Sequence, residues 1–107
     1  MRRHDFSALL DHYPAVIAQM PATFTSHQFI LKLAHDYQGL YVEALGAYCN
    51  ASRQDEQPAP FWKVHSILAK KLYNFPDIVE LVRRDAPSPN IFGALSSCAE
   101  WRRHAAL

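Results

Sequence analysis

Residues 78–102 read IVELVRRDAPSPNIFGALSSCAEWR, and the structure of this stretch decides the fold class. Residues 78–83 are β-branched and partly alternating, residues 85–90 are turn formers, and residues 91–95 and 98–102 can supply a return strand. The stretch therefore predicts a β-hairpin over residues 77–102. The alternative is two short helices, over residues 77–84 and 91–103, because Asp77 can cap the first and Ala, Leu and Glu tolerate helices.

Upstream of this stretch, apolar side chains at spacings of three and four predict helices over residues 4–20, 26–36, 39–50 and 60–73. Thr25 or Ser26 can cap the second of these. A single helix over 26–49 is the alternative to the middle pair, and we favour two helices because Gly39 interrupts the stripe. Residues 50–60 are polar and contain prolines, which indicates a loop. The helix over 60–73 is amphipathic, and its outer face is basic.

Three helices followed by a hairpin make an order that resembles a winged helix-turn-helix domain. The resemblance covers residues 25–104 and leaves residues 1–22 as an N-terminal helical arm of a single domain, 1–107. The expected fold class is mainly α with a small β-hairpin and a three-helix core, and the alternative is an all-α helical bundle. In that superfamily the third helix enters the major groove and the hairpin touches the DNA backbone or the minor groove, but winged helices also serve as protein-binding modules.

The charge of the chain is unevenly distributed, although the net charge is only +1. Residues 1–59 hold four Lys or Arg against six Asp or Glu, whereas residues 60–107 hold seven against four. In the hairpin, two arginine pairs meet near the basic helix, where they can neutralise phosphates. The alternative is an ordinary solvated surface. The DNA contacts predicted in this way are Lys63, Ser66, Lys70, Lys71, Asn74, Arg83, Arg84, Arg102 and Arg103.

Two tryptophans stand apart from the other aromatic residues, which the periodicity assigns to the core. Trp62 lies off the apolar stripe of its helix, and Trp101 lies between charged residues. Each can anchor an interface or be partly covered by the N-terminal arm, and we favour partial burial.

The sequence offers little support for catalysis, metal binding or a cofactor, and we expect none of them. The six histidines lack the spacing of a zinc site, and neither Cys49 nor Cys98 has the surroundings of a nucleophile. Two cysteines are too few for a disulfide framework, so a cytoplasmic location is expected. Neither an export signal nor a membrane span is expected, because charged residues and prolines interrupt the apolar stretches.

These observations predict a small DNA-binding protein that is not an enzyme and that acts as a homodimeric transcriptional regulator. The partner is duplex DNA in this interpretation. The alternative function is a protein–protein interaction module without a nucleic-acid role, in which Trp62, Trp101 and the N-terminal arm contact a protein.

Overall fold

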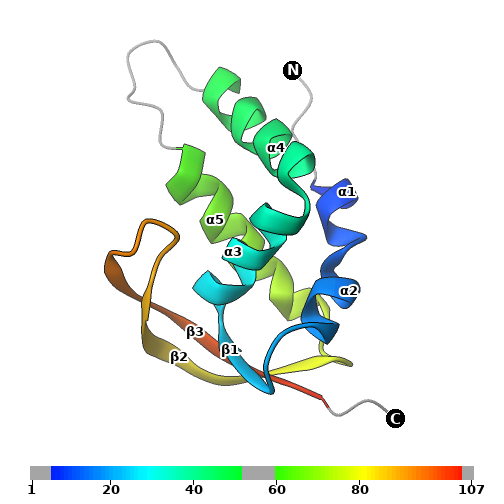
Figure 1. Cartoon of the computed structure of the whole chain (residues 1–107), viewed down its shortest axis with the longest axis vertical. Helices are drawn as coiled ribbons and strands as arrows, with labels where there is room; N and C mark the ends of the chain where they lie inside the picture. Colours follow the sequence, from blue (N-terminus) through cyan, green and yellow to red (C-terminus); the bar gives the residue numbers. More distant parts are fainter. Residues whose placement is uncertain (1–5, 52–59, 105–107) are drawn as a thin grey trace.

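The computed structural model describes residues 6–51 and 60–104, in which helices stack on a small sheet (Figure 1). The elements follow in the order α1 (Ser7–Leu10), α2 (Tyr13–Ala18), β1 (Thr23–Thr25), α3 (Ser26–Asp36), α4 (Gln38–Ala51), α5 (Pro60–Lys70), the 3-10 helix η1 (Lys71–Asn74), β2 (Val79–Pro89) and β3 (Leu95–Arg103). No helix of the described ranges is both long enough and apolar enough to cross a bilayer.

The sheet is antiparallel and has the strand order β1-β3-β2. The β2–β3 pairing confirms the predicted hairpin and shows that the two-helix alternative is wrong. The predicted fold class is also wrong, as is the all-α bundle, because β1 adds a third strand and makes the fold mixed α/β. Strand β1 has only three residues, too few to show an alternation of apolar and polar side chains. It forms because Phe24 packs beside Trp101 of β3.

The turn of the hairpin lies later than the sequence predicts. Strand β2 continues through the predicted turn at residues 85–90, and the chain reverses at residues 90–94 instead. The side chain of Asn90 accepts hydrogen bonds from the backbone N–H groups of Phe92 and Ala94 through its Oδ1. Gly93 follows at a φ of 81°, a conformation that favours glycine. The local hydrogen bonds of asparagine therefore outweigh the two prolines in placing the turn.

The core lies between the helices and the inner face of the sheet. Tyr13 of α2 is fully buried, its ring lies 4.7 Å from that of Phe29 in α3, and its hydroxyl donates to the backbone oxygen of Leu68 at 2.6 Å. Burial raises the pKa of Tyr13 far above its usual value, so this hydroxyl keeps its proton. Residues 6–20, which the sequence assigns to an arm, thus contribute to the same core as the helices and the sheet.

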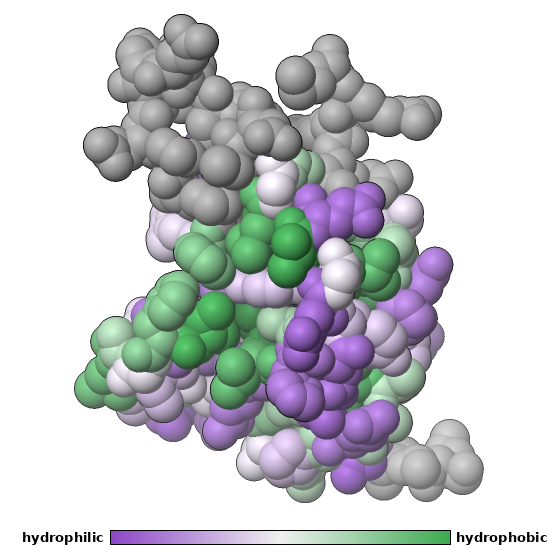
Figure 2. Space-filling model, turned by 45° about the horizontal axis from the view of Figure 1, so that its top comes forward, coloured by the Kyte–Doolittle hydropathy of each residue, from purple (hydrophilic) through white to green (hydrophobic). Residues whose placement is uncertain are grey.

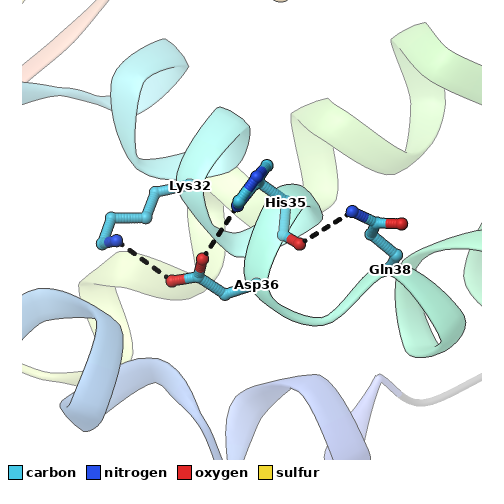
Figure 3. A network of polar contacts seen from close by, with 4 residues as sticks. All are labelled: Lys32, His35, Asp36 and Gln38. Carbon is cyan, nitrogen blue, oxygen red and sulfur yellow. Dashed lines mark hydrogen bonds and ion pairs between the residues drawn. The ribbon is translucent and has the colours of Figure 1, made fainter.

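Helices α3 and α4 are separate, as predicted, and they meet at Tyr37, whose φ of −130° is not helical. Figure 3 shows the polar contacts at this junction: the Asp36 carboxylate lies 3.1 Å from both Lys32 Nζ and His35 Nδ1, and Gln38 donates to the backbone oxygen of His35. Hydrogen bonds from His35 and Lys32 hold the pKa of Asp36 below its usual value. The break comes two residues before Gly39, which itself lies in the first turn of α4.

The start of α3 is fixed by a capping box, so Thr25→Ala should destabilise the fold. The Thr25 hydroxyl accepts from the N–H of Gln28, the Gln28 side chain accepts from the N–H of Thr25, and the same hydroxyl lies 2.9 Å from Ser88 Oγ. We expect the free energy of unfolding to fall by about 1–2 kcal/mol in urea denaturation. Thr23→Ala, an exposed position on the same strand, is the control and should change it by less than about 0.5 kcal/mol.

Candidate functional site

A groove of about 530 Å³ lies between α5 and the β2–β3 hairpin. One wall comes from α5 and η1, the opposite wall from β3 and the hairpin turn, and the N-terminus of α3 closes the base. Figure 2 shows this side of the molecule as a hollow bordered by hydrophobic side chains. The groove is therefore built from segments that lie up to 73 residues apart, as the hydrogen bond from Ser26 to Ala99 illustrates.

Large apolar side chains that are open to solvent gather around this groove. The exposed fractions are 72% for Trp62, 65% for Phe92 and 50% for Tyr73. Phe61 and Phe92 meet edge to face with their ring centroids 5.0 Å apart, which joins α5 to the hairpin turn. Leu95, 77% exposed, begins the neighbouring strand. Several apolar side chains exposed side by side are typical of interaction surfaces, whereas single ones are not informative.

The polar side chains of the groove are neutral or cationic. His27, His65 and Lys70 contribute to its lining, and no Asp or Glu is among the described lining residues. His65 Nε2 lies 2.6 Å from the hydroxyl of Tyr41, which donates when Nε2 carries no proton. Burial lowers the pKa of His65, and the nearby charge of protonated His27 lowers it further. The described lining of the groove thus carries one lysine and two histidines and no carboxylate.

The free energy of unfolding should decrease as the pH is lowered, because protonation of His65 is less favourable in the folded protein than in the unfolded chain. The pKa of His65 is 6.5 in the unfolded chain and lower in the folded protein, so acid favours the unfolded chain as the pH falls through this range. We expect the urea midpoint of the wild type to decrease between pH 7.5 and pH 5.5 by more than that of His65→Gln, which does not titrate there. Equal decreases in the two proteins would contradict a lowered pKa of His65 in the folded protein.

The four predicted phosphate-binding arginines have different surroundings. Arg83 Nε lies 2.9 Å from Glu100, and Arg102 Nη1 lies 3.0 Å from Glu80, so two of the four are paired with carboxylates across β2 and β3. Arg84 is exposed. Arg103 is partly buried, and its Nε has no hydrogen-bond partner among the described residues. Carboxylates of the same two strands therefore offset the charge of two of the four arginines.

The predicted contacts on α5 and η1 are divided between the groove and its surroundings. Ser66 and Lys70 line the groove. Lys63 is exposed on α5, whereas Lys71 and Asn74 belong to η1, and none of these three lines the groove.

The two tryptophans lie in opposite environments, and neither is partly buried as expected. Trp62 is exposed in the groove wall, whereas Trp101 is 2% exposed and its Nε1 donates to Ser26 Oγ at 3.0 Å. Trp101 is therefore a core residue and is not available to anchor a partner. Sequence reasoning missed the exposed Phe92 and Tyr73, which it assigned to the core. For Phe92 a signal existed, since Asn90 and Gly93 beside it indicate a turn.

Comparisons with known proteins assign no family to this chain. No family model matches it, and neither a curated protein nor a solved structure does. The resemblance to winged helix-turn-helix domains accordingly remains a prediction from the order of elements. Within residues 6–51 and 60–104, no three His, Cys, Asp or Glu side chains come together as a metal-binding group.

Proposed function

We propose that this protein is a non-enzymatic interaction module that holds a segment of a protein partner in the groove between α5 and the β2–β3 hairpin. The observation that carries the proposal is the exposure of Trp62, Phe92 and Tyr73 around one concave surface. Aromatic side chains of this kind bury large areas and dominate the energetics of protein interfaces. Cys98 is a free thiol, which supports the proposal of a cytoplasmic location.

The experiment that tests this function is a selection from a displayed library of random heptapeptides on the immobilised full chain. We expect peptides that bind in the micromolar range and lose binding when the groove is altered. A selection that yields no peptide, or peptides that bind equally well to a groove variant, would contradict the proposal.

Duplex DNA is a second candidate partner, and one observation favours it. Lys63, Lys70 and Arg84 are exposed and belong to no ion pair within the described ranges. These cations can release counterions from phosphates, each contact adding about 0.9 to the slope of log affinity against log salt.

A salt titration of binding to a random-sequence duplex tests this second candidate. If DNA is the partner, combining Lys63→Ala, Lys70→Ala and Arg84→Ala should weaken binding and flatten the salt dependence. Undetectable binding at low salt, or binding that these three substitutions leave unchanged, would contradict this candidate.

A further inference from the structure

The edge of β3 that faces the groove is open over half of its length. Strand β1 pairs with β3 only at Glu100–Arg102, because α3 begins at Ser26 and takes the chain away from the sheet. Beyond that point no described strand lies on this side of residues 95–99. Strand β2 covers their other side. One half of β3 thus has a strand on both sides, and the other half has one on a single side.

The backbone groups of the odd-numbered residues of β3 point toward this open edge. On the side of β1, the N–H of Arg103 donates to the oxygen of Ala22 at 2.7 Å, and the oxygen of Ala99 accepts from Ser26 Oγ. On the side of β2, Ser97 lies opposite Pro87, which has no N–H to donate. Backbone groups alternate in direction along a strand, so the N–H and C=O of Ser97 point away from β2 and into the groove.

The lining of the groove agrees with this direction. Four consecutive residues of β3, 96–99, contribute to the wall, whereas a strand that presents only a face would contribute every second residue. The outer edge of β2 differs, because Pro87 and Pro89 remove the N–H groups that would point outward there. Proline at such positions protects a sheet edge from further pairing. One edge of the hairpin is therefore closed to strand addition, and the edge in the groove is not.

We propose that the partner segment in this groove is an extended peptide that adds to the sheet as a strand along residues 95–99 of β3. The proposal rests on the function proposed above and names how the partner binds. A strand rises about 3.4 Å per residue, so roughly five residues of peptide lie along this edge. Backbone hydrogen bonds supply affinity, and alternate side chains supply specificity by reaching Trp62 and Phe92.

The charge of the groove indicates which peptide fits. Lys70 is exposed in the α5 wall, His27 lies at the base, and the described lining has no carboxylate. A peptide with an acidic residue that reaches Lys70, and with apolar residues on the face turned toward α5, is complementary to this surface. A basic peptide is not complementary to this surface, because Lys70 would repel it.

Ser97→Pro tests strand addition, with Ser97→Ala as its matched control. The probe is the tightest heptapeptide from the library selection, titrated into the full chain by calorimetry. Because the N–H of Ser97 takes no part in pairing with β2, proline should leave the hairpin intact, which far-UV circular dichroism and the urea midpoint check. We expect Ser97→Pro to weaken binding at least tenfold and Ser97→Ala to weaken it less than threefold. In the unaltered protein, the peptide should also slow hydrogen exchange of the Ser97 amide at least tenfold.

Charge is tested with a second pair of variants. Lys70→Glu should weaken binding of an acidic peptide at least tenfold, whereas Lys71→Glu, a neighbour outside the groove, should change it less than threefold.

The outcomes separate strand addition from the function on which it rests. If Trp62→Ala removes binding but Ser97→Pro and the exchange of the Ser97 amide show no effect, strand addition is wrong and the protein-binding function stands. If no peptide binds while duplex DNA does, both are wrong. If the open edge instead pairs with a second copy, Ser97→Pro will convert a dimer to a monomer in sedimentation, and the proposal of a separate peptide partner is overturned.

Discussion

Trp101→Ala is expected to lower the free energy of unfolding by about 3–5 kcal/mol, the largest effect of any single substitution proposed for this chain. The side chain is 2% exposed and lies between Phe24 of β1 and Leu81 of β2, with its ring 4.9 Å from that of Tyr73. Its removal leaves a cavity and also leaves the buried Ser26 hydroxyl without the indole donor. Urea denaturation followed by far-UV circular dichroism measures the change without relying on tryptophan fluorescence.

Trp62→Ala is the matched control for this prediction, because it removes the same side chain from an exposed position. It should change the free energy of unfolding by less than about 0.5 kcal/mol. Similar losses in the two variants would contradict the placement of Trp101 in the core and of Trp62 on the surface.

Trp62→Ala combined with Phe92→Ala is expected to weaken binding of a selected peptide by at least about thirtyfold. Each of these side chains exposes most of its surface at the groove, and aromatic anchors in such positions commonly contribute about 2 kcal/mol or more to binding. Since 1.4 kcal/mol corresponds to a factor of ten, even partly additive losses reach this range. Calorimetric titration of the double variant measures the effect.

The control for this double variant is Leu31→Ala combined with Val42→Ala. These side chains are also exposed, at 53% and 62%, but they lie on α3 and α4 outside the groove lining. Peptide affinity should change by less than about threefold. An equal loss in both double variants would mean that binding depends on general surface hydrophobicity and not on the groove.

Helix α3 and the β2–β3 hairpin could be predicted from the sequence, because nearby residues determine them. The bounds of α3 follow from Thr25, whose hydroxyl caps the helix, and from the periodic apolar residues after it. The hairpin follows from the β-branched residues at 78–83. In both places the information lies within a few residues of the element that it determines.

The rest of the fold depends on partners that are distant in the sequence. Strand β1 forms because its three residues pair with 100–102 of β3, and nothing in TFT alone distinguishes a strand from a cap. The register between β2 and β3 shifts twice between Leu81 and Ala86, and regular alternation predicts neither shift.

The groove could not be predicted for the same reason. Periodicity assigns aromatic residues to the core by their place on a helix or strand, but a helix such as α5 contacts the core along one stripe only. Whether Tyr73 or Trp62 is covered depends on how closely the hairpin approaches α5, which is a property of the whole fold. Likewise, the charge of Arg83 and Arg102 is offset by Glu100 and Glu80 only because the register places them together.

Nuclear magnetic resonance mapping tests most directly whether the groove between α5 and the hairpin is the binding surface. The full chain, labelled with nitrogen-15, is titrated with the tightest selected heptapeptide, and the amide shifts are followed. The largest changes should fall on residues 61–73 and 90–99, with little change at residues 38–48 of α4. Changes that concentrate instead on α4, or on the outer sheet face that carries Arg83 and Arg102, would contradict the assignment of the groove.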